Sequence, residues 1–260
     1  MTNIKISIIT ITFNSEKTIR DTLESVRKQF YPNLEYIVID GLSTDNTLQI
    51  VNDYSDIVTH IVSEKDKGIG DAMNKGISLA TGDLIGIIHS DDALYPGALD
   101  FLNKVWDGVS DVYYGNALII NKNGRPKHVL KSAKDLSNMP FEYLLVHPAT
   151  FVTKKCYNEH GVFNINYKCA MDYELFLRFY NENVTFKYID AILSFYREGG
   201  TNMVYRNVTI DEVCDISIKY GANPKKAKRI RKYKKLKVLF HPLISFLKLK
   251  NKRVYKYENH

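Results

Sequence analysis

The stretch Lys5–Thr12 reads KISIITIT, a short run of apolar and β-branched residues. Such a run is typical of a strand that is buried on both faces, as the strands of a parallel sheet are. Asn14 or Ser15 can then cap a helix, because apolar residues recur at helical spacing over Ile19–Phe30. The start of the chain therefore predicts a buried strand followed directly by a helix.

The same alternation continues through the first half of the chain. The expected elements are strand Glu35–Asp40, helix Thr44–Tyr54, strand Ile57–Ser63, a helix from Asp71 to Thr81-Gly82, and strand Leu84–His89. Strands that alternate with helices indicate right-handed βαβ units. The fold class is therefore α/β, with a mostly parallel, Rossmann-like sheet and helices on both of its faces.

The alternation weakens in the second half of the chain. Strand patterns cover Asp111–Asn121, Val146–Thr153 and Thr185–Tyr196, and an amphipathic helix is expected at Asp172–Asn181. The segment Asn121–Arg125 (NKNGR) is typical of a hairpin turn. We expect this half to form an antiparallel edge together with helices that pack on the first half.

The composition is that of a soluble globular protein. Of 260 residues, 45% are hydrophobic and 25% are charged, and no apolar run approaches the roughly 20 residues of a membrane-spanning helix. The first residues lack the order of a signal peptide. Three widely spaced cysteines, Cys156, Cys169 and Cys214, suit neither a disulfide framework nor a zinc site. We therefore expect a reducing, cytoplasmic compartment.

The net charge of +7 is concentrated in a basic amphipathic tail, residues 224–260. From residue 225 onward the chain has 14 Lys or Arg and one Glu, against 22 Lys or Arg and 28 Asp or Glu before it. An apolar stretch, Val238–Leu247, interrupts the basic run, and Pro242 is expected to break any helix through it. This pattern favours contact with an anionic membrane surface through residues 225–253, although a basic helix packed on the body is the alternative. Because the charge lies in one terminal run with few interleaved aromatic residues, no nucleic-acid partner is expected.

Polar side chains gather where the predicted strands end, at Thr12–Asn14, Asp40, Glu64–Lys67 and Asp91–Asp92. Ligands of open α/β sheets bind outside the carboxyl ends of the strands, so we expect these residues to form one site. Two adjacent carboxylates repel each other unless a cation lies beside them, and their oxygens suit Mg²⁺ or Mn²⁺ bound to a diphosphate. Alternatively, the Asp91–Asp92 pair caps the next helix and Asp40 is a turn residue.

Asp172 and His147 are candidate site residues in the second half. Asp172 opens its helix, where a carboxylate can act as a general base toward a substrate hydroxyl or can cap the helix. Glu174 competes for the same role. His147 precedes Pro148 in an apolar stretch, so it is either a core histidine or part of the site. Neither the glycine-rich dinucleotide fingerprint nor the P-loop occurs in the chain.

Five stretches carry a likeness to known proteins: Ile6–Asn14 (ISIITITFN), Glu35–Thr47 (EYIVIDGLSTDNT), Ser63–Ala93 (SEKDKGIGDAMNKGISLATGDLIGIIHSDDA), His147–Phe151 (HPATF) and Ala170–Arg178 (AMDYELFLR). In order and spacing they resemble the family 2 inverting glycosyltransferases of the GT-A fold, over about residues 4–200. The bacterial subgroup that builds capsule, O-antigen or exopolysaccharide repeat units is the most similar. Two positions depart from the pattern, since His89 stands where the family often has Asp and Gly70 where the subgroup tends to have Tyr.

The resemblance implies a role for each candidate residue. The implied roles are nucleotide binding by Thr12, Phe13, Asp40, Asp66, Lys67, Asp71 and Asp91, metal binding by Asp91 and Asp92, general-base catalysis by Asp172, and a place on the acceptor side for His147. The metal would be Mn²⁺ or Mg²⁺. Whether His89 takes part in binding it is left open.

The implied activity is metal-dependent, inverting transfer of a sugar from a nucleotide donor, with UDP expected, to a hydroxyl of a glycan or lipid-linked acceptor in cell-surface polysaccharide synthesis. Residues 1–223 would form the catalytic domain, with a nucleotide-binding half of about 1–110 and an acceptor half of about 111–223. The enzyme would be peripheral on the inner face of the cell membrane.

Two alternatives to this activity stay open. A sugar nucleotidyltransferase would normally have a glycine-rich basic loop after the first strand, and ITFNSEKTIR is not such a loop. A catalytically inactive, membrane-associated scaffold of a polysaccharide assembly complex would not need the acidic residues that the chain retains.

Overall fold

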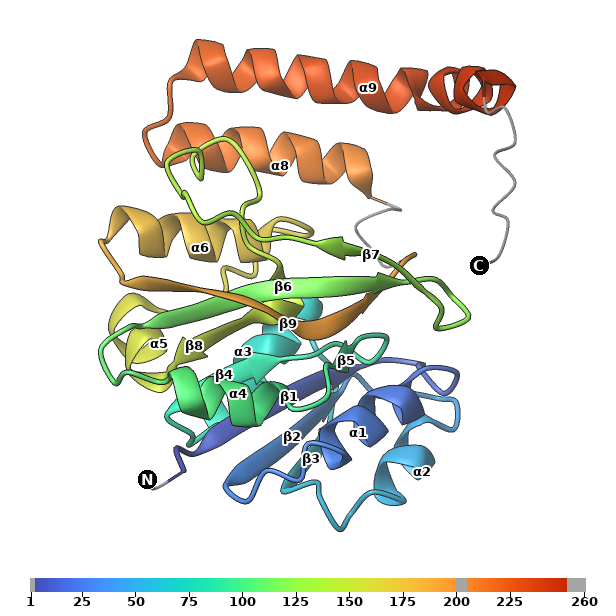
Figure 1. Ribbon diagram of the computed structural model, residues 1–260, viewed down its shortest axis with the longest axis vertical. Helices are drawn as coiled ribbons and strands as arrows, with labels where there is room; N and C mark the ends of the chain where they lie inside the picture. The colour runs from blue at the N-terminus through green and yellow to red at the C-terminus, as the bar shows by residue number, and fades with distance from the viewer. Residues whose placement is uncertain (1–2, 200–204, 252–260) are drawn as a thin grey trace, which may run out of the picture.

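A nine-stranded mixed sheet forms the centre of the part of the chain that the computed structural model describes, residues 3–199 and 205–251, with the backbone alone over 241–251 (Figure 1). The strands are β1 Ile6–Thr12, β2 Leu34–Asp40, β3 His60–Ser63, β4 Leu84–Ile87, β5 Ala93–Leu94, β6 Val112–Ile120, β7 Pro126–Leu130, β8 Thr150–Thr153 and β9 Phe186–Arg197. The helices are α1 Ile19–Arg27, α2 Thr47–Asn52, α3 Ile69–Leu79, α4 Ala98–Val105, α5 Lys154–His160, α6 Met171–Asn181, α8 Arg206–Lys219 and α9 Pro224–Asn251, with a short 3₁₀ helix η1 at His147–Ala149.

Strands β3, β2, β1 and β4 lie side by side and pair in parallel. Buried side chains of β1 alternate between two cores, since Ile6 and Ile8 pack with α1, α2 and α4 whereas Ile9 and Ile11 pack with α3 and α6. Helix α3 approaches the sheet closely, because a Cβ on Gly76 would lie 2.4 Å from Cγ2 of Ile9. Helices thus cover both faces of a parallel sheet, and the predicted α/β class is confirmed.

The second half completes the sheet with mostly antiparallel pairs. Strand β8 pairs antiparallel with β4 and β6, β7 pairs antiparallel with β6 through the expected turn, and β9 runs parallel to β6. Strand β8 begins at Thr150 rather than at Val146. Pro148 has no amide hydrogen to give to a ladder, and the residues around it form η1 instead.

The segment after β4 differs from the expected helix cap. Asp91 and Asp92 do not cap α4, because β5 follows them directly and pairs antiparallel with β9. Helix α4 begins only at Ala98. The short strand β5 therefore connects the end of the parallel half to the second half of the sheet.

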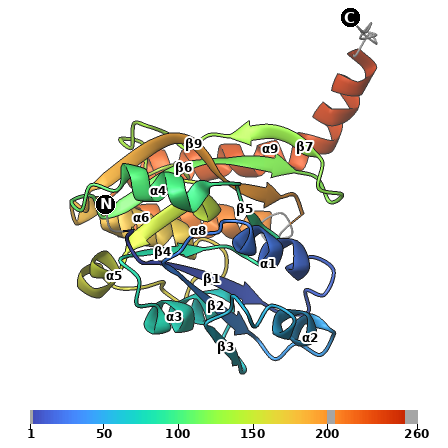
Figure 2. The same ribbon diagram turned by 60° about the horizontal axis from the view of Figure 1, so that its bottom comes forward.

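Helices α8 and α9 form an outer layer beyond α6 (Figures 1 and 2). Ser217 of α8 contacts α6 through its hydroxyl, which lies 3.0 Å from the hydroxyl of Tyr173. Asp211 of α8 forms ion pairs with Arg231 (3.8 Å) and Lys235 (2.6 Å) of α9. Part of the basic tail is therefore docked on the body.

Helix α9 continues through Pro242 to Asn251, so the expected break at Pro242 was wrong. A proline inside a helix removes one hydrogen bond and can bend the helix without ending it. Over residues 3–199 and 205–251, no helix combines the length and the apolar character that crossing a membrane requires.

Candidate active site

A cleft of ≈ 930 Å³ opens at the carboxyl ends of the parallel strands. Its walls are the loops after β1 and β2, the loop that leads from β3 to α3, and the loop after β4. Gly41, directly after β2, lies close to the loop between β3 and α3, because a Cβ there would lie 2.5 Å from Oδ2 of Asp66. The cleft has the position in which open α/β sheets bind ligands.

A smaller cavity of ≈ 120 Å³ adjoins the cleft. Ile69, His89 and Asp91 line both spaces, so the two meet just beyond β4. The smaller cavity is also lined by Asp92, His147, Pro148, Met73, Lys168, Cys169, Met171, Asp172 and Tyr196. The structure thus brings the candidate metal ligands and the candidate base to the walls of one connected site.

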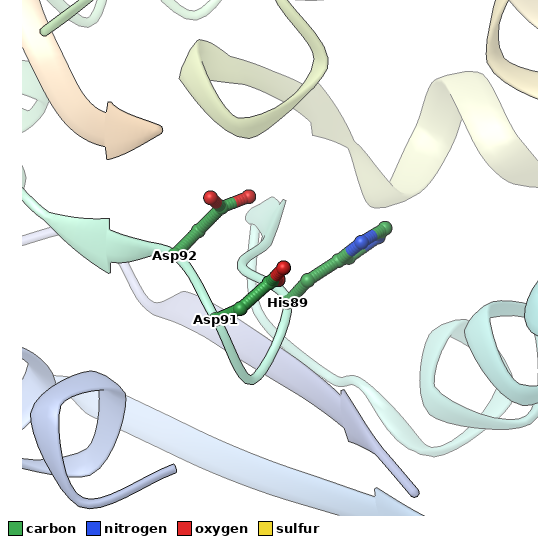
Figure 3. A group of neighbouring side chains, drawn as sticks. All are labelled: His89, Asp91 and Asp92. Atoms are coloured by element: carbon green, nitrogen blue, oxygen red, sulfur yellow. The ribbon is translucent and has the colours of Figure 1, made fainter. Parts of the chain in front are cut away.

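His89, Asp91 and Asp92 project from one loop and form a group that could hold a metal ion (Figure 3). One ligand atom from each side chain lies within 4.8 Å of the others. Burial lowers the pKa of His89, and its Nε2 atom has no hydrogen-bond partner among the residues described. Burial, reinforced by the charge of Asp91, raises the pKa of Asp92 well above its ordinary value. A divalent cation fits this group, because it would offset the paired carboxylates and engage a neutral imidazole nitrogen.

Arg197, the last residue of β9, holds the loop that carries these side chains. Its backbone N–H donates to Oδ1 of Asp92 (2.9 Å), and its Nε donates to the carbonyl of Asp91 (3.0 Å). Its Nη2 forms an ion pair with Asp21 (2.8 Å). Thr22 of α1 donates to the carbonyl of Asp92 (2.6 Å) from another side. Sequence reasoning missed Arg197, because it lies 105 residues beyond the aspartate that it holds.

Asp172 lies in the first turn of α6, at the wall of the smaller cavity. Its Oδ1 accepts hydrogen bonds from the N–H of Tyr173 (2.8 Å) and from the hydroxyl of Tyr143 (3.3 Å). Desolvation outweighs these hydrogen bonds and raises the pKa of Asp172 to about 6. Such a carboxylate is ionised at neutral pH and more basic than an ordinary aspartate, as a general base should be.

The two competing residues are placed differently. Glu174 is buried, forms an ion pair with Arg178 (3.4 Å) and lines neither the cleft nor the smaller cavity. His147 lines the smaller cavity, with its ring centroid 5.5 Å from that of His89. Burial and the neighbouring His89 lower the pKa of His147 to about 3, so its ring is neutral at pH 7. The geometry favours Asp172 as the base.

Four of the predicted nucleotide-binding residues line the cleft, namely Thr12, Phe13, Asp66 and Asp91. The ring of Phe13 is 60% exposed. The hydroxyl of Thr12 is buried and, within the described part of the chain, makes no hydrogen bond. Phe13 therefore presents an apolar face to the cleft, whereas the hydroxyl of Thr12 lies beneath the surface of the cleft wall.

The other three, Asp40, Lys67 and Asp71, are not among the residues that line the cleft. Asp40 is fully buried, and its carboxylate accepts hydrogen bonds from Ser43 and from the hydroxyl of Ser63 (2.7 Å). Asp71 lies in the first turn of α3, not at its cap, and accepts from the N–H of Lys67 (3.0 Å). All three shape loops beside the cleft, and their contacts with a nucleotide stay predictions.

Comparisons of the sequence with known proteins point to one family. The profile described as Glycosyl transferase family 2 matches residues 7–177. A PGL/p-HBAD biosynthesis glycosyltransferase of Mycobacterium tuberculosis is 30% identical over 205 residues, covering 75% of this chain and 77% of the relative. An uncharacterized glycosyltransferase of Rickettsia prowazekii is 29% identical over 186 residues, covering 67% of this chain and 58% of the relative.

Two solved structures share the fold. TarS of S. aureus, residues 1–349 in complex with UDP-GlcNAc, has a TM-score of 0.66 at 22% identity, over 87% of this chain and 70% of that chain. The mannosyltransferase PcManGT from Pyrobaculum calidifontis, in complex with GDP-Man and Mn²⁺, has a TM-score of 0.66 at 16% identity, over 89% of this chain and 69% of that chain. The fold is of the GT-A type, as expected.

Proposed function

The chain belongs to glycosyl transferase family 2, and we propose that this glycosyltransferase moves a sugar, with inversion, from a UDP-linked donor to a hydroxyl of a glycan or lipid-linked acceptor. The observation that carries the proposal is that the cleft and the smaller cavity meet at His89 and Asp91, with Asp172 in the wall of the smaller cavity. A donor in the cleft would present its anomeric carbon near this junction. The proposed setting is cell-surface polysaccharide synthesis.

The proposed reaction is a single displacement. Asp172 accepts the proton of the acceptor hydroxyl while that oxygen forms a bond to the anomeric carbon. The bond from this carbon to the diphosphate oxygen breaks in the same step, and UDP leaves with the electron pair. Because attack and departure occur on opposite faces, the configuration inverts. Tyr143 orients the carboxylate through its hydrogen bond to Oδ1.

We assign a divalent cation, Mn²⁺ or Mg²⁺, to Asp91 and Asp92 with His89 as a third ligand. When bound there it would neutralise the charge that develops on the departing diphosphate. An imidazole nitrogen in the ligand set favours Mn²⁺ over Mg²⁺. The grouping of the three side chains and the Mn²⁺ complex of the Pyrobaculum mannosyltransferase support the assignment.

UDP is the proposed nucleotide. The S. aureus structure holds UDP-GlcNAc, whereas the Pyrobaculum structure holds GDP-Man. Thr12, Phe13 and Asp66 are the residues proposed to contact the nucleotide directly, since they line the cleft.

Donor binding and nucleotide release test the proposal together. UDP-, GDP- and dTDP-sugars are compared in a thermal-shift assay, with and without Mn²⁺, because a ligand of the native state raises the unfolding temperature. We expect UDP-sugars to give the largest shift, and only with metal. Equal shifts for all three nucleotides would overturn the assignment of UDP. A donor that binds but never yields free UDP with any acceptor would favour an inactive scaffold.

We also propose that α9 attaches the enzyme to an anionic membrane, at the inner face of the cell membrane. The exposed residues Arg229, Lys232, Leu236 and Phe240 recur at intervals of three and four and so share one face of the helix. The opposite side packs on α8, where Ala227 is 3% exposed. Basic and apolar side chains on one exposed face suit a helix that lies on an anionic bilayer, where each cation contributes about 1 kcal/mol.

Substitution tests this attachment better than truncation, because removal of α9 would uncover the surface of α8 beneath it. The variant Leu236→Ser with Phe240→Ser is expected to lose most sedimentation with vesicles that contain anionic lipid, and wild-type binding should weaken in high salt. Val109→Ser, at an exposed apolar position outside α9, is the matched control. Undiminished sedimentation of the double variant would overturn the attachment. Lys252 and Arg253, part of the predicted membrane segment, lie outside the described residues.

A further inference from the structure

Glu212 of α8 holds the backbone that leads into α6. One of its carboxylate oxygens accepts a hydrogen bond from the N–H of Lys168 (2.7 Å), and the other accepts from the N–H groups of Cys169 and Ala170 (both 2.8 Å). Ala170 flanks the N-terminus of α6 and provides no side-chain cap. Glu212 therefore supplies, from a different helix, the anion that the N-terminus of a helix favours.

These three hydrogen bonds act on the wall of the smaller cavity. Lys168, Cys169 and Asp172 all line that cavity, and Asp172 follows the held backbone by two residues. The hydrogen bond from Tyr143 fixes the rotation of the Asp172 carboxylate but not the position of the helix that carries it. Glu212 therefore holds the backbone directly before the turn that carries Asp172.

Helix α8 has other anchors besides Glu212. Ser217 contacts Tyr173, with 3.0 Å between the hydroxyls, and Asp211 pairs with Lys235 of α9 (2.6 Å). Loss of the Glu212 carboxylate is thus expected to leave α8 docked and to release only the start of α6. Glu212 also lies beyond residues 7–177, the part of the chain that matches the family profile.

We propose that Glu212 is a positioning residue for the transfer reaction, because its carboxylate sets the start of α6 so that Asp172 faces the acceptor hydroxyl. The inference rests on the proposed role of Asp172 as the general base. A displacement of about 1 Å from the reactive geometry costs roughly 10²-fold in rate. The donor cleft is lined by the end of β1, by the loops after β1, β2, β3 and β4 and by α3, with no residue from α6 or α8. The expected signature is a lower kcat at unchanged donor affinity.

Glu212→Gln is the test variant, because it keeps the size of the side chain but places an amide nitrogen where an acceptor stood. We expect kcat to fall roughly 10- to 100-fold while the Kd for UDP and the KM for the donor stay within about twofold of wild type. Asp211→Asn, the preceding residue on α8, is the matched control. It weakens the ion pairs with α9 and should leave kcat within about twofold of wild type.

Hydrogen exchange gives a second measurement that does not depend on turnover. The amides of residues 168–170 should exchange roughly tenfold faster or more in Glu212→Gln than in wild type, and Asp211→Asn should leave them protected. The inference is overturned if kcat of Glu212→Gln is close to that of wild type. It is also overturned if the variant loses affinity for UDP as well as kcat, because the effect would then not be confined to Asp172.

Turnover by the wild type and hydrogen exchange in the variant distinguish a failure of the proposed function from a failure of this inference. If wild-type protein turns over no donor, the proposed function fails, and the exchange measurement alone decides whether Glu212 holds the start of α6. Unchanged exchange at residues 168–170 then overturns the inference. If Asp172→Asn keeps wild-type turnover, another residue is the base, and the positioning role proposed for Glu212 is overturned as well.

Discussion

Replacing Asp172 by Asn is expected to slow the reaction strongly and, at the same time, to stabilise the fold at neutral pH. The pKa of Asp172 is about 6 in the folded protein, against an ordinary value of 3.8. At about 1.4 kcal/mol per pKa unit, folding disfavours the ionised carboxylate by up to about 3 kcal/mol. Because the folded-state pKa is raised, the wild type loses this stability as the pH rises from about 4 to about 6. Asn cannot ionise, so the variant avoids the loss.

The assay is urea unfolding of both proteins between pH 4.5 and pH 8. The difference in unfolding free energy, variant minus wild type, should be smallest at pH 4.5 and approach its maximum of about 3 kcal/mol by pH 7. The matched control is Asp215→Asn, at an exposed position of α8, which should show no such growth with pH. Turnover by Asp172→Asn should fall by roughly 10²-fold or more relative to wild type.

The reasoning is refuted if the Asp172→Asn variant is less stable than wild type at pH 7, or if the difference between the two proteins does not change with pH. Either result would mean that the folded protein does not penalise the charge on this carboxylate. A variant that is both active and more stable would leave the desolvation argument intact but remove Asp172 from the reaction.

Three further predictions follow from the site and the sheet. Asp92→Asn should weaken Mn²⁺-dependent UDP binding by roughly tenfold or more in calorimetry without lowering the unfolding temperature, and an unchanged Kd would remove this residue from the metal site. The kcat of the wild type should rise with pH through about 6, because only ionised Asp172 can accept a proton, and a flat profile between pH 5 and pH 7 would argue for another base. Gly86→Ala should destabilise the fold by about 1–3 kcal/mol in urea unfolding, because its Cβ would lie 2.3 Å from the ring of Phe151, and an unshifted midpoint would contradict that packing.

Much of the fold could be predicted from the sequence because the parallel half is encoded locally. Lys5–Thr12 is a buried apolar run, and the bounds of β1 differ from it by one residue. The second half was harder, since β6 pairs not only with β7 across the predicted turn but also with β8 and β9, which lie much further along the chain. A pattern of alternating residues does not say which strand is the neighbour. At Val146–Thr153 the apolar pattern predicted a strand, but the missing amide hydrogen of Pro148 shortened it.

The candidate site divides in a similar way. Asp91, Asp92 and Asp172 could be predicted from two features of the sequence. Each is a carboxylate, and each lies at the end of a predicted strand or the start of a predicted helix, where ligands of α/β sheets bind. Arg197 and Glu212 could not, because each acts largely on backbone N–H or carbonyl groups. Almost every residue type offers the same backbone N–H and carbonyl groups, so a hydrogen bond to the backbone cannot be predicted from the type of the residue that is held. Such contacts are seen only in the folded chain.

The contact between Arg197 and Asp92 also has a consequence for synthesis on the ribosome. Strands β1 and β4 can pair as soon as β4 has emerged, but the loop that carries Asp91 and Asp92 gains its hydrogen bond from Arg197 only when the end of β9 follows, 105 residues after Asp92. At typical rates of translation this takes roughly 5 to 20 s. During that interval the nascent chain lacks the end of β9, which holds Asp91 and Asp92 in the folded protein. The candidate metal-binding loop is therefore expected to reach its final geometry late in translation.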